Sequence, residues 1–301
     1  MILFDTDVVI IRYWGTKKER DFIDSLIKDC RNRTEEIGIT TFIKGELYRT
    51  MLDALVFSYN IFLKKLEDVN DENNLNLKNY IQHFKDILNR LLPIKRTRRK
   101  ERIKNIVQNM ILESLENLIT DISSGRSIRN PLRTILLHLY TYISNFDAIF
   151  IDPIFNIRKS KIDCQWANFD LSGYVNHINA PIKNIGYGCS RFMCKEKKII
   201  VHWFKDHKNI IKDIINLYED FDSPIIKPSW IGSLIILNSN LNRTPPCQNN
   251  IYKLCRDIGD FFLITDSSSS DKILSSNYND YESVCKYLNI QFIKLKRDIF
   301  K

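Results

Sequence analysis

Four acidic residues, Asp5, Asp7, Glu46 and Asp266, stand where a strand is expected to end or a helix to begin. Carboxylate oxygens are the ligands that Mg²⁺ and Mn²⁺ prefer, and such ions activate water and neutralise charge when a phosphodiester is hydrolysed. Acids at the carboxyl ends of neighbouring parallel strands meet in the crevice where open α/β sheets bind ligands. The sequence therefore predicts a metal-dependent phosphodiesterase centre with Asp5, Glu46 and Asp266 as its catalytic residues.

The N-terminal elements that must position these acids are two short strands and their helices. Residues 2–4 are continuously apolar, as a central parallel strand is, and residues 37–40 predict a second strand. Between them, Thr16 and Glu19 have the spacing of a capping box, which predicts the start of a helix. A longer helix that carries Glu46 in its first turns is expected after the second strand.

The last third of the chain returns to alternating strands and helices. Residues 261–264 are apolar and predict a strand with Asp266 just beyond its end. The remaining expectations are helices at residues 131–144 and 279–288 and strands at residues 148–151, 198–201 and 291–295.

Three motifs resemble those of the PIN-type metal-dependent nucleases. That family opens with an apolar strand ending in Asp-Thr-Asn or a close variant, which Asp5-Thr6-Asp7 resembles. A second strand leads into a helix with an early Glu, often in a Glu-Leu pair, as at Glu46-Leu47. A third strand ends in Thr and Asp, as at Thr265-Asp266.

The resemblance implies a three-layer α/β core with a central, mainly parallel sheet. Residues 1–67 and 246–301 would form this core, and a mostly helical insertion at residues 68–245 would interrupt it and partly complete it. The implied activity is that of a hydrolase, an endonuclease with bound Mg²⁺ or Mn²⁺ that cleaves RNA more commonly than DNA, in a toxin or defence system. The implied metal ligands are Asp5, Asp7, Glu46, Asp266 and Asp271, supported by Thr6, Thr265, Asn249, Asn250 and Ser267.

The C-terminal acidic motif departs from the family pattern. A further Asp is usual at the start of the preceding helix, where this chain has Asn249 and Asn250, and a neutral amide is a weaker ligand for Mg²⁺. Ser267 stands where many members have another Asp, and Asp271 is a candidate substitute. Three interpretations remain open: a single-metal site, a site that uses Asp271, or a degenerate PIN-like protein that binds RNA or a protein partner without cleaving.

A basic run provides a candidate nucleic-acid contact in a chain of 301 residues with a net charge of +9 and a pI of about 9.1. Its basic residues are Lys95, Arg96, Arg98, Arg99, Lys100, Arg102 and Lys104. They could neutralise phosphates and hold RNA near the acidic site, or dock an acidic protein partner. The alternative is a solvated loop or helix end.

Cysteine and histidine spacing gives one candidate for a structural zinc site. Cys189, Cys194, His202 and His207 are the ligand types of a Cys₂His₂ site, but their spacing departs from the finger pattern. Unrelated thiols and a surface His pair are therefore favoured, and Trp203 is expected in the core.

Composition also bounds the compartment in which the chain is expected. The odd count of seven Cys favours reduced thiols, and acids within the first seven residues exclude a signal peptide. No apolar run approaches the ~18 residues that a membrane helix needs. We expect a soluble cytoplasmic protein with no membrane partner.

Overall fold

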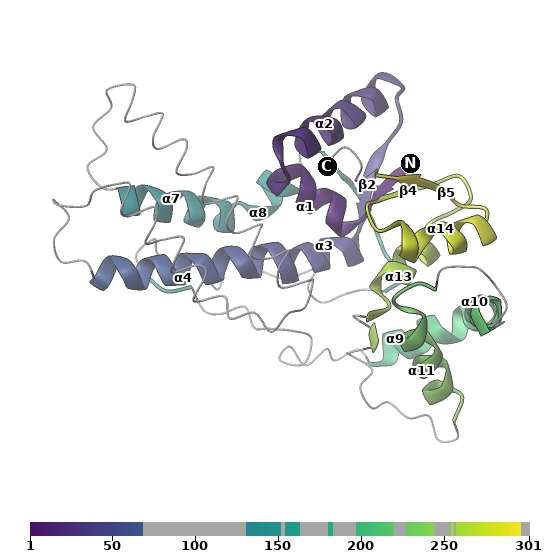
Figure 1. Ribbon diagram of the computed structural model, residues 1–301. Coiled ribbons are helices and arrows are strands. Elements are labelled where there is room, and N and C mark those ends of the chain that lie inside the picture. Colours follow the sequence, from purple (N-terminus) through teal and green to yellow (C-terminus); the bar gives the residue numbers. More distant parts are fainter. Residues whose placement is uncertain are drawn as a thin grey trace.

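The computed structural model describes residues 1–68, 131–151, 154–162, 180–182, 197–219, 227–243, 254–255 and 257–295. Within these ranges the chain forms a parallel sheet with helices around it (Figure 1). The expected α/β class and parallel sheet are therefore confirmed. None of the helices in these ranges is both long enough and apolar enough to cross a membrane.

Within the described residues, five short strands form the sheet in the order β3-β2-β1-β4-β5, and all neighbouring pairs are parallel. The strands are β1 (Ile2–Phe4), β2 (Ile37–Thr40), β3 (Asn156–Arg158), β4 (Lys272–Ser275) and β5 (Gln291–Lys294). All residues of β1 and β2 are buried, because both faces of a central parallel strand are covered. In the register of β1 and β4, Ile2 pairs with Lys272 and Phe4 with Leu274. The residues that follow these two strands therefore lie at the same edge.

The N-terminal helical segments are α1 (Thr6–Trp14), α2 (Lys17–Asn32), α3 (Thr41–Leu47), the π-helix η1 (Tyr48–Leu52) and α4 (Asp53–Asp68). Two of them lie where helices were expected, the one after Thr16 and the one that carries Glu46, whereas α1 was not predicted. The capping box of Thr16 and Glu19 is present at the start of α2, as predicted. The segments α3, η1 and α4 follow one another without a break, and π-turns of this kind are frequent at functional sites.

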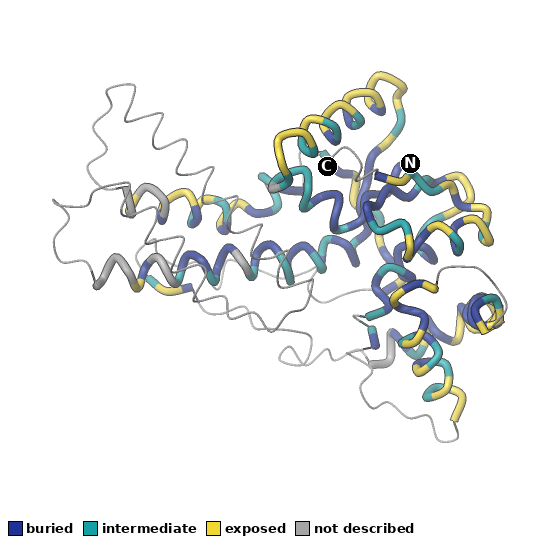
Figure 2. Tube along the Cα trace, viewed as in Figure 1, coloured by how far each residue is buried: buried dark blue, intermediate teal, exposed yellow. Residues whose placement is uncertain are grey.

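The remaining helices form two groups. They are α7 (Pro131–Ser144), α8 (Phe146–Phe150), α9 (Lys197–Asp206), α10 (Lys208–Glu219), α11 (Ile231–Leu241), α13 (Gly259–Asp266) and α14 (Tyr278–Tyr287). The helix α7 packs along α4, and the pair extends away from the sheet, whereas α9, α10 and α11 lie beside α13 (Figure 1). Buried segments concentrate where the sheet meets α3 and α13 (Figure 2).

Three segments expected to be strands are helical. Residues 148–151 fall largely in α8, residues 198–201 in α9, and residues 261–264 in α13. A short apolar run fits a buried helix as well as a buried strand, and tertiary packing decides between them. In α13 the run is surrounded: the ring of Phe262 meets Phe42 of α3 at 5.0 Å and Trp203 of α9 at 4.7 Å between centroids.

The other predicted C-terminal elements are confirmed, whereas β3 and β4 were not predicted. Helix α7, helix α14 and strand β5 lie where they were expected. The proposed limits of the insertion at residues 68–245 stay a prediction, because much of that range is outside the described residues.

Candidate active site

Asp5 lies directly after the central strand and starts the next helix. Its Oδ1 accepts a hydrogen bond of 2.7 Å from the backbone N–H of Thr6, so that it acts as the N-cap of α1. Its Oδ2 accepts a hydrogen bond of 2.8 Å from the hydroxyl of Ser275 at the end of β4. Asp5 is buried, with an exposed fraction of 4%. It therefore joins the ends of two neighbouring strands, as the sequence predicted for this edge.

Asp7 lies two residues further on and is also buried, with an exposed fraction of 7%. Its Oδ2 accepts hydrogen bonds from the backbone N–H of Ser276, at 3.2 Å, and from the Ser276 hydroxyl. Its Oδ1 is buried without a hydrogen-bond partner. Leaving a buried acceptor unsatisfied costs about 1–3 kcal/mol, more for a charged group, so this atom calls for a donor or a cation.

Glu46 extends from α3 toward the same edge. Its Oε2 accepts a hydrogen bond of 2.7 Å from the hydroxyl of Thr6, and its Oε1 pairs at 2.7 Å with Nη2 of Arg49. Both side chains of this ion pair are largely buried. Two donors therefore fix Glu46, and one of them is cationic.

Asp260, which the sequence analysis did not select, lies at the start of α13 beside Glu46. The preceding residue, Gly259, permits this approach, because a Cβ there would lie 2.9 Å from Phe42 and 3.3 Å from Oε1 of Glu46. The neighbouring carboxyl group of Asp280 helps to raise the pKa of Asp260, after burial and the charge of Glu46.

Asp280, in the first turn of α14, is held from the other side. It is buried and accepts hydrogen bonds from the backbone N–H of Ser229, at 2.5 Å, from the Ser229 hydroxyl, at 3.0 Å, and from the side chain of Asn277. Its own backbone carbonyl accepts a bond of 3.0 Å from the indole N–H of Trp230. The orientation of this carboxylate is therefore set by neutral donors.

These five acids form one electrostatic group, which we call the acidic cluster: Asp5, Asp7, Glu46, Asp260 and Asp280. Burial raises the pKa of Asp5 well above its usual value, and the charges of Asp7, Asp260 and Glu46 raise it further. Burial, followed by Glu46, Asp280 and Asp7, does the same to the pKa of Asp260. Like charges in a desolvated site disfavour ionisation. Asp5 and Asp260 therefore bind protons more tightly when no cation is present.

Tyr281 is the neutral neighbour of this cluster. Burial raises its pKa well above the usual value, and the charges of Asp260, Asp5, Asp7 and Glu46 add to the effect. Its hydroxyl is buried and makes no hydrogen bond. The phenol is therefore a neutral O–H donor held next to a group of carboxylates.

The residue types of the acidic cluster suit a hard divalent cation, but the present positions of the carboxylates do not form a complete metal site. All its ligand atoms are carboxylate oxygens, as Mg²⁺ and Mn²⁺ prefer, and Oδ1 of Asp7 is without a partner. However, within the described ranges no three His, Cys, Asp or Glu side chains converge closely enough to hold an ion. Serine and threonine hydroxyls and the Arg49 guanidinium instead satisfy the individual carboxylates.

Asp266 does not belong to this cluster, in contrast to the prediction. It ends α13, whose start carries Asp260, and about 9 Å of helix separates the two residues. Its Oδ1 accepts a bond of 2.9 Å from the backbone N–H of Lys161, and its Oδ2 accepts one from the Ser160 hydroxyl. Burial raises the pKa of Asp266 although these bonds oppose the shift. Asp266 therefore holds the segment after β3.

Asp271 also lies apart from the cluster. It precedes β4, about 13 Å along the strand from Ser275, at the end where Met1 lies. Two nitrogens of Arg158 hold its carboxylate, at 2.5 and 3.0 Å. Burial opposes the charged form, but the bonds from Arg158 and from Ser268 hold the pKa of Asp271 well below its usual range. It is a structural ion-pair residue and does not substitute for a missing metal ligand.

The other predicted site residues have mixed outcomes. Thr6 supports Glu46 as expected, whereas Thr265 and Ser267 make hydrogen bonds to carbonyls within α13, Thr265 to Phe262 and Ser267 to Leu263. The remaining candidates lie outside the described residues: Asn249, Asn250, Cys189, Cys194, and the basic residues of 95–104. The zinc and basic-run hypotheses therefore stay predictions.

The error in the sequence analysis has one source, the assignment of residues 261–264 to a strand. In the structure the strand is β4, and the helix that precedes it is α13. Asp260 lies in the first turn of α13, so an acid is present at the start of that helix, the position at which the sequence analysis had found only Asn249 and Asn250. Gly259 before Asp260 was the signal, since a glycine there permits close approach to another element. Asp280, early in a correctly predicted helix, offered a second signal.

Comparison of the chain with protein-family models, with curated proteins and with solved structures finds no match.

Proposed function

We propose that this protein is a metal-dependent phosphodiesterase, an endoribonuclease of the PIN type, whose centre is the acidic cluster. The observation that carries the proposal is the grouping of Asp5, Glu46 and Asp260 near the carboxyl ends of β1 and β2: Asp5 follows β1, Thr6 binds Glu46, and the charges of these acids raise the pKa values of Asp5 and Asp260. Such a site gathers negative charge that a divalent cation would compensate. The chemistry matches the resemblance of Asp5-Thr6-Asp7 and Glu46-Leu47 to PIN nucleases.

The side chains would divide the work according to their present contacts. Asp5, Asp7 and Asp260 would hold Mg²⁺ or Mn²⁺, which supplies activation of water and neutralisation of phosphate charge when bound. Glu46, oriented by Thr6, would position the attacking water. Asp280 is fixed by Ser229, and it would add negative charge beside Asp260.

The test is cleavage of end-labelled single-stranded RNA by the purified full chain in Mn²⁺, with an EDTA arm. We expect cleavage by the wild type, loss in Asp5→Asn and Asp260→Asn, and retention in the matched control Asp21→Asn, which removes an equal charge from an exposed position of α2. Equal cleavage by wild type and Asp5→Asn would indicate a contaminant. The absence of cleavage by the wild type in both Mg²⁺ and Mn²⁺ would refute the nuclease proposal.

A second candidate, a PIN-like protein that binds RNA or a protein partner without cleaving, is favoured by one observation. Arg49 already neutralises Glu46, and no three acids within the described ranges converge on one ion position. In that case the wild type and Asp5→Asn would bind labelled RNA equally well, and neither would cleave it.

A further inference from the structure

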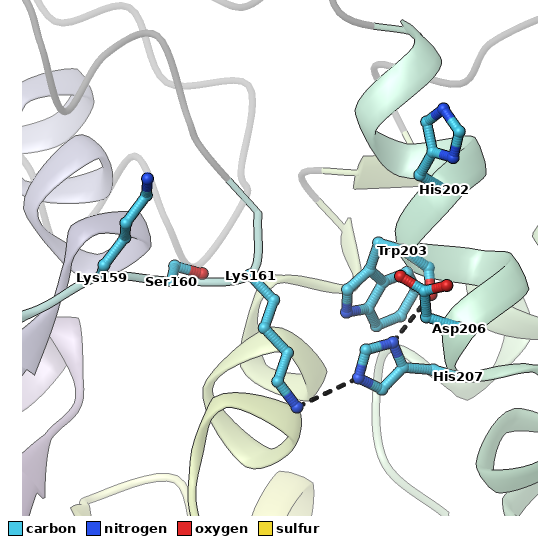
Figure 3. A pocket seen from close by; sticks show the side chains of 7 residues that line it. All are labelled: Lys159, Ser160, Lys161, His202, Trp203, Asp206 and His207. Carbon is cyan, nitrogen blue, oxygen red and sulfur yellow. Dashed lines mark hydrogen bonds between the residues drawn. The ribbon is translucent and has the colours of Figure 1, made fainter.

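A pocket of about 330 Å³ lies between the segment that follows β3 and helix α9 (Figure 3). Its lining residues are Lys159, Ser160, Lys161, His202, Trp203, Asp206 and His207. The volume is at the lower end of the range for small-ligand sites. The pocket lies at the end of α13 away from the acidic cluster, because Nζ of Lys161 donates a bond of 3.0 Å to the carbonyl oxygen of Thr265.

His207 holds the ammonium group of Lys161 in this pocket. Its Nδ1 lies 2.8 Å from the carbonyl oxygen of Trp203, and its Nε2 lies 3.3 Å from Nζ of Lys161. A carbonyl only accepts and an ammonium only donates, so Nδ1 of His207 donates to Trp203 and Nε2 accepts from Lys161. The two hydrogen-bond acceptors of the Lys161 ammonium are therefore an imidazole nitrogen and the backbone carbonyl oxygen of Thr265.

Trp203 contributes a donor that lacks an acceptor. Its side chain is buried, with an exposed fraction of 2%, and its indole Nε1–H makes no hydrogen bond. Figure 3 shows this nitrogen on the side of the ring that faces Lys161. An indole N–H can only donate, so a ligand with an acceptor atom would satisfy it. An anion would accept a hydrogen bond from the indole N–H of Trp203 and would also interact favourably with the Lys161 ammonium.

We propose that this pocket binds a phosphate group of a nucleic-acid strand, with Lys161 and Trp203 as its donors and Lys159 at its rim. The lining contains two lysines and one aspartate, Asp206, and the carboxylate of Asp266 lies beside the Lys161 backbone at the end of α13. A lysine ammonium binds phosphate as a point charge. The assignment to nucleic acid rests on the proposed function. Inorganic phosphate and free mononucleotides present the same chemistry, and the experiment separates these sources.

The position of the pocket gives the subsite its role. Helix α13 carries Asp260 at its start and, at its end, Thr265 and Asp266, which bind Lys161. The acidic cluster repels an anionic strand except where a cation is bound, whereas the pocket attracts it. A phosphate held about 9 Å along α13 from Asp260 would anchor the strand a short distance from the proposed centre.

The experiment measures binding of a labelled oligoribonucleotide to the full chain by fluorescence anisotropy, in EDTA and at several salt concentrations. We expect Lys161→Gln to weaken binding by about tenfold and to reduce the slope of log K against log salt by about 0.7, the value for one phosphate contact on a single strand. Trp203→Phe should weaken binding without changing the slope, because it removes a donor and no charge.

Matched variants exclude a merely structural effect. Lys161→Arg keeps the charge and should restore the slope, and Lys28→Gln removes a lysine that is exposed on α2 and should leave both affinity and slope unchanged. The proposal is overturned if Lys161→Gln behaves like Lys28→Gln. It is also overturned if Lys161→Arg fails to restore the slope while its unfolding temperature equals that of the wild type.

Competition then identifies the source of the phosphate. Inorganic phosphate and a 5′-mononucleotide should displace the oligonucleotide only weakly. The nucleic-acid assignment is overturned if Lys161→Gln weakens the binding of one of these small ligands but does not weaken the binding of the oligonucleotide. The proposed function fails separately. If the wild type binds the oligonucleotide through Lys161 but does not cleave it in Mn²⁺, the nuclease proposal is refuted and the pocket proposal stands. If cleavage depends on Asp5 but Lys161→Gln binds as tightly as the wild type, only the pocket proposal is refuted.

Discussion

The hydroxyl of Thr6 donates a 2.7 Å hydrogen bond to Oε2 of Glu46 and so joins the helix that follows β1 to the helix that follows β2. This contact spans two neighbouring strand ends and is the most direct link between the two N-terminal motifs. It makes the orientation of Glu46 depend on a residue that is itself no ligand in the proposed centre.

Replacement of Thr6 by Val tests this link. The change keeps the branched shape but removes the hydroxyl, so that Glu46 retains only Arg49 as a partner. We expect RNA cleavage to fall by about tenfold to a hundredfold, as misplacement of a positioned group does. Thr6→Ser, which keeps the hydroxyl, should retain activity. If the two variants cleave equally well, Thr6 does not orient Glu46 for catalysis.

The metal-free protein should lose stability as the pH rises from acid toward neutral. The raised pKa values of Asp5 and Asp260 mean that these groups bind protons more tightly in the folded state than in the unfolded chain, where an Asp titrates near about 4. Their contribution is therefore fully present below that value and is lost as the pH rises through the folded pKa. Calorimetry in EDTA should show this decline, and Asp260→Asn should reduce it. An unchanged pH profile in Asp260→Asn would contradict the assignment.

Divalent ions should reverse that loss at neutral pH. If the cluster binds Mn²⁺ only in the folded state, an ion concentration one hundred times the Kd adds about 2.7 kcal/mol to the free energy of unfolding. The unfolding temperature should rise with Mn²⁺ in the wild type and much less in Asp7→Asn, which removes the charge beside the unpartnered Oδ1. Asp21→Asn, at an exposed position of α2, is the control. Equal shifts in both variants would place the ion elsewhere.

Asp271 should matter for stability and not for chemistry. Asp271→Asn leaves the partly buried Arg158 without its charged partner and should cost about 1.5–3 kcal/mol of unfolding free energy. Because the folded pKa of Asp271 is depressed, this stabilisation is present at neutral pH and is lost as the pH falls through the usual Asp range. Urea unfolding measures the cost. Loss of cleavage in a variant that remains fully folded would return Asp271 to the active site.

Gly259 should tolerate no side chain. Gly259→Ala places a Cβ 2.9 Å from Phe42 and 3.3 Å from Glu46, so we expect a cost of about 1–3 kcal/mol and a loss of cleavage. Gly232→Ala in α11 is the matched control, since no atom lies within 4 Å of the added Cβ. In a helix this control should be neutral or stabilising by about 0.5–1 kcal/mol. Equal unfolding temperatures for the two variants would show that α13 approaches α3 less closely.

The N-terminal half of the site could be predicted because local signals and tertiary structure agree there. The run Ile2-Leu3-Phe4 is a short apolar segment that ends at Asp5, and an aspartate is a favoured helix N-cap. Glu46 follows a strand and a helix start that the sequence marks clearly. In each case the chemistry-bearing residue is adjacent in sequence to the element that positions it.

The C-terminal half was misjudged because its local pattern is ambiguous. Residues 261–264 are apolar on every side, since α13 is enclosed by Phe42, Trp203 and the sheet, and this burial erases the helical periodicity that would have identified it. Because these residues were assigned to a strand, the acid at its end, Asp266, was selected as the site residue in place of Asp260. The partners of Lys161 and Trp203 in the pocket are likewise set by long-range packing, which no local pattern reveals.

The central position of β1 has a consequence for biosynthesis. One edge of β1 pairs with β2 soon after it is made, but the other edge waits for β4, and Asp5 meets Ser275 across 270 positions of sequence. Contacts of such high sequence separation form late and slowly. A ribosome-bound nascent chain would therefore present Asp5 and Glu46 without Asp260 or Asp280, so that the acidic cluster is incomplete until the C-terminal segment has been made.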